Sequence, residues 1–384
     1  MTRKGKLLKL LDELANRKKR LSKFLLDNQL DAAVFLKEEI ELVNGNFIYY
    51  GGAQTSGEYA AIVVDSGGNS YAIVHEYSFE RVAKSGLYDR VYEIRQSIDQ
   101  LILTLKQLMQ EKIPGKKRVA FDFSTLTANT LDLIRGSGID AKNNDLMKFV
   151  YSQRALKSRF ELEEMERAIA VAKGAFERTL DSLKTGQSIA DISKLLSKNM
   201  IDEETLPSFE IDIRLRRGLK EKEVDKLQRG DLVLFDFGVR LPSMYPSDVG
   251  RTIPFGVASP ETKDFMRDVV AIKKEGVKKI KKGVSGNATR EAIDKLIEEY
   301  GYVSTHRPGH QIGINVHDPY GPHLAYGAEN TGKLQSGNVV TWEPGIGFKE
   351  SPGPKNRFGM AHMEDMVLVG TNSRVLGDFD LEYW

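Results

Sequence analysis

Hydrophobic positions along the first 150 residues recur with the periods of both helices and strands. Leucines at helical spacing predict one helix over residues 5–28, and a similar pattern predicts another over residues 97–112. Short β-branched and apolar runs predict buried strands at residues 32–36, 60–65, 70–75 and 118–123. The second and third of these runs are joined by Ser-Gly-Gly-Asn, which predicts a hairpin. Strands that alternate with helices in this way favour a compact α/β domain.

Longer amphipathic helices are predicted in the rest of the chain. They cover residues 161–183, 261–281 and 289–300, and a short Gly-Val-Ser-Gly-Asn segment separates the last two. The segment 141–158 precedes the first of them, and we interpret it as a joint between domains. The pattern therefore predicts two domains, residues 1–152 and 153–384.

Two segments of the second domain repeat one another. Residues 226–239, KLQRGDLVLFDFGV, align without a gap on residues 333–346, KLQSGNVVTWEPGI, which start 107 positions later. Each copy has a polar turn, a short apolar strand and then a carboxylate, Asp236 in the first copy and Glu343 in the second. An ionised carboxylate in a protein interior is costly unless it is paired or bound to a metal. The repeat therefore suggests two related half-domains that close around one cation site.

Each half contains a second acid beyond a turn. Asp248 follows Asp236 by twelve residues, and the midpoint of the pair is a proline in a turn-prone segment. Glu364 follows Glu343 by twenty-one residues, and their midpoint falls within Ser-Pro-Gly-Pro-Lys-Asn at residues 351–356. We therefore expect two hairpins, each with its two acids across from one another on adjacent strands.

Five of the six histidines lie near these acids, within 57 residues: His306, His310, His317, His323 and His362. The first three share a segment whose Pro and Gly residues exclude a zinc-binding helix. A lone histidine is more often structural than a ligand, but this clustering favours a site. Four carboxylates and one imidazole suit two divalent ions a few ångströms apart, with Mn²⁺ or Co²⁺ ahead of Zn²⁺ or Fe²⁺. The set predicts metal-assisted hydrolysis of an amide, and the spacing does not say which amide.

Composition narrows the function classes. The net charge of +2 gives no field that selects nucleic acid, and a lysine-rich stretch at residues 273–282 fits one solvated helix face. The absence of cysteine excludes disulfides, thiolate catalysis and sulfur-ligated metals. The N-terminus has too many charges for a secretory signal, and no apolar run is long enough to span a membrane. We expect a cytoplasmic protein with neither a nucleic-acid nor a membrane partner.

Five ordered motifs resemble the pita-bread metallopeptidases. These are residues 230–238, the segment 247–252, Gly-His-Gln-Ile-Gly at 309–313 with His317-Asp318, Glu343-Pro-Gly, and Met-Glu-Asp at 363–365. Within that superfamily the chain looks like the Xaa-Pro peptidases, which comprise prolidase and Xaa-Pro aminopeptidase. The resemblance covers the whole chain and implies an α/β (α+β) fold: a creatinase-type N-terminal domain followed by a pita-bread catalytic domain with pseudo-duplicated halves.

The resemblance also implies a function and a set of roles. It implies hydrolysis of the Xaa-Pro bond in short peptides by a homodimer that uses two divalent metal ions. The implied ligands are Asp236, Asp248, His310, Glu343 and Glu364, with Asp248 and Glu364 bridging. His306 and His317 are expected to line the substrate pocket, His317 as a hydrogen-bond donor to the developing oxyanion. Glu343 is the candidate proton shuttle.

The chain departs from the family pattern at two places. The loop histidine that relatives have some seventeen residues before the first ligand is absent, and a basic segment with Arg214, Arg216 and Arg217 stands there. His362 occupies the position, two residues before the last glutamate, where relatives commonly have arginine. Both changes fall near the substrate. The arginines are either ligands for a substrate carboxylate or part of a solvated loop.

Two rival functions remain open at this stage. One is a same-fold hydrolase of a small non-peptide amide, of the creatinase or ectoine-hydrolase kind. The other is a catalytically idle peptide- or protein-binding module, for which the missing loop histidine speaks. The intact ligand motifs favour the metallopeptidase over both.

Overall fold

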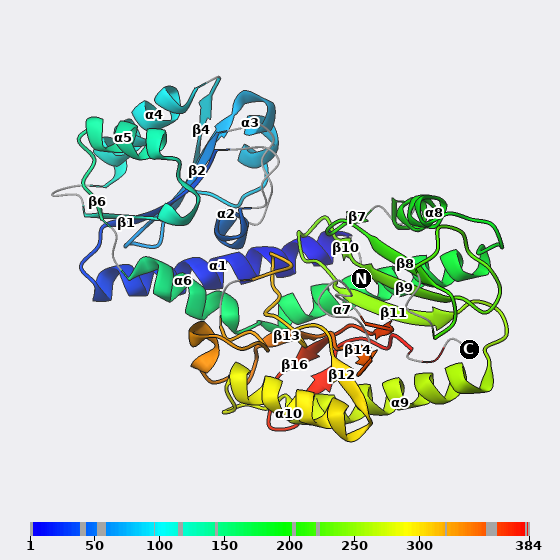
Figure 1. Cartoon of the computed structure of the whole chain (residues 1–384). Helices are drawn as coiled ribbons and strands as arrows, with labels where there is room; N and C mark the ends of the chain where they lie inside the picture. The colour runs from blue at the N-terminus through cyan, green and yellow to red at the C-terminus, as the bar shows by residue number, and fades with distance from the viewer. Residues whose placement is uncertain are drawn as a thin grey trace. The chain divides into compact units, whose positions relative to one another are not determined.

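The computed structural model describes the chain except for residues 1–2, 39–43, 52–58, 96, 114–117, 143–144, 202–204, 220–222, 319–320, 351–358, 381 and 383–384. The chain divides into two compact units, Met1–Gln153 and Arg154–Trp384 (Figure 1). Within the described residues, no helix has the length and apolar character that a membrane span needs.

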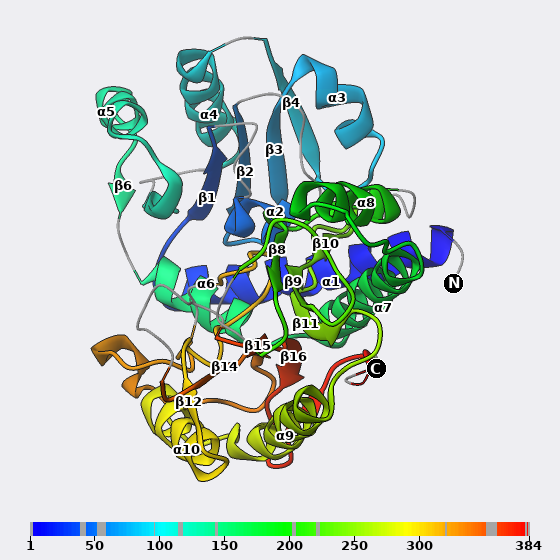
Figure 2. The same ribbon diagram turned by 45° about the vertical axis from the view of Figure 1, so that its right-hand side comes forward.

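The first unit is built on a six-stranded mixed sheet with the order β4-β3-β2-β1-β5-β6 (Figure 2). Its strands are β1 (Ala32–Lys37), β2 (Ala60–Asp65), β3 (Ser70–His75), β4 (Arg90–Ile94), β5 (Val119–Phe121) and β6 (Ala141–Lys142). The predicted hairpin is confirmed, because β2 and β3 pair antiparallel with Val64 opposite Ser70. The predicted strand at residues 118–123 is shorter than expected, since a 3-10 turn begins at Phe123.

Helices cover both faces of this sheet. They are α1 (Arg3–Asp27), α2 (Gly45–Gly51), α3 (Glu76–Ala83), α4 (Ile98–Lys112) and α5 (Ala128–Gly136), and α6 (Leu146–Ala155) follows. The apolar face of α4 packs on every second residue of β1 and β2, such as Val34 and Val63, while α1 and α2 also contact these two strands. This two-sided burial explains why β1 and β2 are apolar throughout rather than alternating.

The second unit contains two sets of short strands, each accompanied by a pair of helices (Figure 1). The first set comprises α7 (Arg159–Asp181), α8 (Ile189–Ile201), β7 (Leu206–Pro207), β8 (Asp212–Arg216), β9 (Leu232–Phe237), β10 (Val239–Arg240) and β11 (Val249–Pro254). The second set comprises α9 (Pro260–Gly276), α10 (Gly286–Glu299), β12 (Tyr302–Ser304), β13 (Val339–Trp342), β14 (Gly345–Phe348), β15 (Ala361–His362), β16 (Asp365–Leu368) and β17 (Arg374–Val375). The three predicted helices of this unit are confirmed as α7, α9 and α10.

The sequence repeat is a structural repeat as well. In each copy the glycine before the strand has a positive φ, 89° at Gly230 and 94° at Gly337, so both turns need glycine. The lysine that begins each copy forms an antiparallel bridge to a serine before a helix: Lys226 to Ser188, and Lys333 to Ser285. The duplication therefore extends to the Lys-x-Gly-x-Ser turns before α8 and α10, which the sequence comparison did not detect.

Candidate metal centre

The first hairpin has a different register from the expected one. Strands β9 and β11 pair antiparallel, and the residue opposite Asp236 is Gly250, whereas we expected Asp248. The prediction assumed a turn centred on Pro242, but Met244 adopts a positive φ of 73° and Val239 pairs with Ser247 through the Ser247 N–H. Asp248 lies two residues before Gly250, so it shares a sheet face with Asp236 as a diagonal neighbour. Both acids therefore still point to one side of the sheet.

The second hairpin agrees with the expected register. Trp342 pairs with Asp365, and Gly345 pairs with His362, so the register between these pairs places Glu343 opposite Glu364. The turn expected at residues 351–356 lies outside the described residues.

Main-chain hydrogen bonds join the two hairpins at the acids. The Glu364 N–H donates to the Gly250 carbonyl oxygen at 2.9 Å, and the Gly250 N–H donates back at 3.2 Å. The segment with His310 runs beside β13, because the Thr341 N–H donates to the His310 carbonyl oxygen at 2.8 Å. The His310 N–H in turn donates to the Thr341 hydroxyl at 3.0 Å. Backbone pairing thus brings acids from both halves and one imidazole to the same place.

The side chains form two groups that meet at one carboxylate. Asp236, His362 and Glu364 each offer an atom within 4.8 Å of the others, and so do Asp248, His310 and Glu364. His310 Nε2 lies 3.4 Å from Asp248 Oδ2 and 3.5 Å from Glu343 Oε1. All members of both groups are buried. A carboxylate shared between two donor groups is an arrangement that fits neighbouring cations.

The site carries excess buried negative charge. Burial and the nearby Asp248, Glu343 and Asp236 carboxylates raise the pKa of Glu364 well above its usual range, and burial also raises the pKa of Asp248. Burial opposes ionisation of Glu343 too, but His310 and His306 outweigh it and lower its pKa to about 2. Glu364 Oε1 is buried without a hydrogen-bond partner among the described residues. Bound cations would stabilise these carboxylates, so the donor set fits divalent metal ions.

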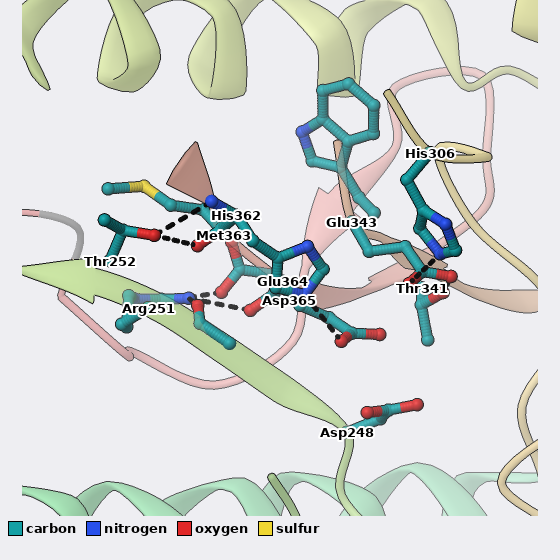
Figure 3. Close-up of polar contacts among 12 residues, drawn as sticks. Asp248, Arg251, Thr252, His306, Thr341, Glu343, His362, Met363, Glu364 and Asp365 are labelled. Carbon is teal, nitrogen blue, oxygen red and sulfur yellow. Dashed lines mark hydrogen bonds and ion pairs between the residues drawn. The ribbon is translucent and has the colours of Figure 1, made fainter. Parts of the chain in front are cut away.

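Two buried, positively charged side chains form hydrogen bonds with the main chain next to the acids. Arg251 donates to the Glu364 carbonyl oxygen at 2.7 Å and to Asp365 Oδ1 at 2.7 Å (Figure 3). The Lys273 ammonium on α9 donates to the carbonyl oxygens of Trp342 and Met363, the residues directly before Glu343 and Glu364. Lys273 also lies 3.1 Å from Asp365 Oδ2. Arg251, Lys273 and Asp365 therefore form a buried network that fixes the main-chain positions of Glu343 and Glu364.

The other predicted site residues differ in their placement. The His317 ring lies beside the His310 ring, with centroids 4.2 Å apart, and its pKa falls to about 4 because of burial and the neighbouring His310. His306 Nε2 lies 3.2 Å from Glu343 Oε2 (Figure 3). His362 is fully buried and its Nε2 lies 3.5 Å from Glu364 Oε2. His317 therefore lies beside His310, while His306 and His362 contact the Glu343 and Glu364 carboxylates.

The three arginines of the basic segment contact carboxylates of the protein. Arg214 donates to both oxygens of Asp212, at 3.2 and 3.0 Å. Arg216 is buried, with Nη2 3.8 Å from Glu223, and Arg217 Nε lies 2.6 Å from Asp231 Oδ1. Asp212 stands directly opposite Asp236 in the β8–β9 pair, and Arg214 follows it by two residues. By this register Arg214 is the nearest of the three arginines to the acids.

A cavity of about 500 Å³ lies at the acids of the site. The five predicted ligands and His317 line it, together with Ile189, Phe209, Glu210, Ile211, Asp212, Ile213 and Val316. His306, His362 and the three arginines are not among the lining residues. The cavity therefore has an acidic floor and a mainly apolar wall.

Sequence reasoning missed the buried cations around the site. Arg251 lies within the motif at residues 247–252 but was assigned no role there. Lys273 was assigned to a solvated helix face, an interpretation that is wrong for this residue because it is 2% exposed. The available signal was position: Lys273 is spaced by three or four residues from the buried Val269, Val270 and Gly276 on the apolar side of α9.

Comparisons with known proteins agree with this geometry. Residues 17–156 match the Creatinase/Prolidase N-terminal domain, and residues 163–371 match Metallopeptidase family M24. A relative from Bacillus subtilis (strain 168), named uncharacterized peptidase YqhT, is 28% identical over 315 residues, which cover 79% of this chain and 84% of the relative.

Solved structures show the same fold. The X-Pro aminopeptidase from Thermotoga maritima MSB8 has a TM-score of 0.79 at 23% identity, over 95% of this chain and 99% of that one. The Xaa-Pro dipeptidase from Bacillus anthracis has a TM-score of 0.75 at 25% identity, over 96% of this chain and 99% of that one. The predicted creatinase-type domain followed by a pita-bread domain is confirmed.

Proposed function

This chain belongs to metallopeptidase family M24, and on that premise we propose that it hydrolyses the bond before proline in short peptides with two divalent metal ions. The observation that carries the proposal is that Glu364 lies close to Asp236 on one side and to Asp248 and His310 on the other. One group alone would fit a single ion. Two groups with a common carboxylate support a dinuclear site.

The donor atoms indicate which residues would hold the metals. Asp236, Asp248, Glu343, Glu364 and His310 are buried and line one cavity. The set is mostly carboxylate with one imidazole, which suits Mn²⁺ or Co²⁺ and also admits Zn²⁺ or Fe²⁺. Two such ions supply Lewis-acid stabilisation to the charge that develops on a scissile carbonyl oxygen.

The neighbouring side chains would transfer the proton, donate a hydrogen bond to the oxyanion and position Glu343. Glu343 can accept and return a proton at its Oε2, the atom that His306 Nε2 contacts at 3.2 Å. The His317 imidazole is neutral at pH 7, because burial lowers its pKa to about 4, so one ring nitrogen carries a proton that can be donated to an oxyanion. His306 does not line the cavity, so we assign it the positioning of Glu343 rather than contact with substrate.

The size and lining of the cavity favour a small substrate that places an apolar residue of its own near the acids. Its volume of about 500 Å³ is within the range of pockets that enclose small ligands. Phe209, Ile211, Ile213 and Val316 provide an apolar wall against which a proline ring can pack. The two solved relatives described above are an X-Pro aminopeptidase and an Xaa-Pro dipeptidase.

Metal analysis combined with a peptide assay tests the proposal. The protein is stripped with a chelator, reloaded with Mn²⁺ or Co²⁺, and offered Xaa-Pro dipeptides, longer Xaa-Pro peptides and matched Xaa-Ala peptides. We expect two ions per chain and hydrolysis of the Xaa-Pro series alone. Two bound ions with turnover of a small non-peptide amide instead would favour the first rival. Loaded protein that binds these peptides without cleaving them would favour the binding module.

A further inference from the structure

We propose that His362 is itself a metal ligand, which binds the ion held between Asp236 and Glu364. The inference rests on the proposed dinuclear site and adds a donor that the motif resemblance did not include. It makes the two sites alike: each would then combine an imidazole with carboxylates, His362 on the Asp236 side and His310 on the Asp248 side.

The first support is the position of the imidazole among donors. One ring nitrogen of His362, one Asp236 oxygen and one Glu364 oxygen all lie within 4.8 Å of one another. His362 Nε2 is 3.5 Å from Glu364 Oε2, and His362 is 0% exposed. Donor atoms that share one cation are typically about 3 Å apart, since each lies about 2.1 Å from the metal. A small inward movement of these side chains would complete the site.

The second support is the way the backbone of His362 is held. The Thr252 hydroxyl on β11 accepts from the His362 N–H at 2.8 Å and donates to the His362 carbonyl oxygen at 2.9 Å (Figure 3). On the other side, the antiparallel pairing of β14 and β15 places Gly345 opposite His362. Both neighbouring strands thus hold the main chain of His362, which fixes the point from which its ring extends toward the acids.

The third support is the space left by Gly250, the residue opposite Asp236. A Cβ built on Gly250 would lie 2.9 Å from His362 Nε2, 2.8 Å from its Cδ2 and 3.1 Å from Glu364 Cβ. The ring therefore occupies the volume that a side chain at position 250 would fill, over β11, the strand paired with the one that carries Asp236. The glycine gives the imidazole access to the first donor group.

A second imidazole has a chemical consequence for the choice of metal. Carboxylate-only positions suit Mg²⁺ and Mn²⁺, whereas imidazole suits Zn²⁺, Fe²⁺ and related ions. With His362 as ligand, the Asp236 side should discriminate against Mn²⁺ more strongly than a site made of carboxylates alone. The alternative is that His362 only donates a hydrogen bond to Glu364 and orients it. The test must separate ligation from orientation.

Two substitutions make that separation. His362→Gln keeps a hydrogen-bond donor but removes the imidazole, while His362→Phe keeps the ring volume and removes both. His75→Gln, in the other unit, removes an imidazole that is not part of the site and serves as the matched control. Circular dichroism and thermal unfolding of the metal-free proteins verify that each variant folds.

The direct readout is proton NMR of the full-length protein loaded with Co²⁺. An imidazole bound to Co²⁺ gives a strongly shifted N–H resonance that disappears in deuterated water. We expect two such resonances in the wild type and in His75→Gln, and one in His362→Gln and His362→Phe. In parallel, competition with a chelator should show that both His362 variants lose at least about 100-fold in affinity for one ion, since even an outer hydrogen-bond partner is worth about 10–100-fold.

The outcomes are distinguishable from those that test the proposed function. A single shifted resonance in the wild type, or normal metal affinity in His362→Gln with a loss only in His362→Phe, would reduce His362 to an orienting residue and leave the peptidase proposal intact. Two resonances in a protein without Xaa-Pro hydrolysis would support the ligand and contradict the peptidase. A protein that binds no Co²⁺ would overturn both.

Discussion

The Nε2 atom of His306 lies 3.2 Å from Oε2 of Glu343, on the opposite end of the carboxylate from His310. Glu343 Oε1 also accepts from the Thr341 hydroxyl at 3.2 Å. The glutamate is therefore held between two imidazoles and a hydroxyl, and the two imidazoles outweigh burial and lower its pKa. This arrangement leaves Glu343 ionised, with its carboxylate lining the cavity.

Removal of His306 should therefore impair turnover more than metal binding. We expect His306→Phe to lower kcat about 10–100-fold, the usual cost of losing a partner that orients a catalytic or ligating group. Metal content should stay at the wild-type value, as measured by atomic emission on the same samples used for kinetics. An unchanged kcat would show that Glu343 needs only His310 and Thr341.

Replacing Glu364, the carboxylate shared by the two donor groups, should instead remove the metal as well as the activity. Glu364→Ala removes the one residue common to both donor groups, so we expect loss of bound metal and of activity together. Glu291→Ala, an exposed glutamate on α10, is the matched control and should retain both. The measurement is metal content after gel filtration. Full metal content in Glu364→Ala would exclude Glu364 as a bridging ligand.

The His317 imidazole lines the cavity beside His310 without belonging to either donor group. We expect His317→Ala to keep its metal and to lose about 10²–10³ in kcat, the typical cost of one oxyanion donor. Steady-state kinetics with parallel metal analysis checks this. If the substitution releases metal, the division between ligands and donors proposed above is wrong at this residue.

The structure narrows the substrate-carboxylate hypothesis to Arg214. This residue pairs with Asp212, which lines the cavity, whereas Arg217 pairs with Asp231, which does not. We expect Arg214→Met to raise the KM for Xaa-Pro dipeptides about tenfold, which matches one charge-assisted hydrogen bond of about 1.5 kcal/mol. Longer peptides, with a neutral amide at that position, should change little.

Arg217→Met serves as the control for Arg214, because it removes the same charge at a distance from the cavity lining. Its KM ratio between dipeptides and tripeptides should equal that of the wild type. Equal losses on both substrate lengths in Arg214→Met would assign the basic segment to structure.

The buried lysine on α9 predicts a pH dependence of stability. Burial lowers the pKa of Lys273 from its ordinary 10.5 to about 8, against the opposing charge of Asp365. Between these two values the unfolded chain binds the proton and the folded chain has released it, so this lysine makes the free energy of unfolding rise with pH. The rise between pH 8 and 10.5 should reach about 3 kcal/mol at most.

Chemical denaturation of the wild type and Lys273→Met across this pH range measures the effect. The free energy of unfolding of the wild type should increase relative to the variant from pH 8 to 10.5 and be constant relative to it below pH 8. Lys274→Met, an exposed neighbour on the same helix, should show no such difference. Parallel curves for the wild type and Lys273→Met would mean that Lys273 stays protonated in the folded protein.

The sequence predicted more of the second hairpin than of the first, for a physical reason. The Glu343–Glu364 register follows from the Trp342–Asp365 and Gly345–His362 pairs on either side, which agree with the midpoint of the two acids. The loop after β10 contains Met244 with a left-handed backbone, which turn composition alone does not reveal. The Asp236 register was therefore wrong by two residues, although the sheet face was right.

Long-range contacts were the other limit. Apolar periodicity located α9 but did not show that Lys273 reaches carbonyl groups 69 and 90 residues further along the chain. The fit of the His362 ring over Gly250 was equally hidden, because the two residues are 112 positions apart in sequence. Motifs identified the acids of the site, whereas the residues that position them depend on how the two halves close.

The Lys273 ammonium binds main-chain oxygens ahead of Glu343 and Glu364 and leaves the side chains of these acids to other partners. The shape of the cavity is thereby uncoupled from the chemistry inside it. A gene duplicate that lost its acids by point substitution would keep the same hollow on an intact scaffold. Such a descendant could change from cutting peptides to holding them without first acquiring a new fold.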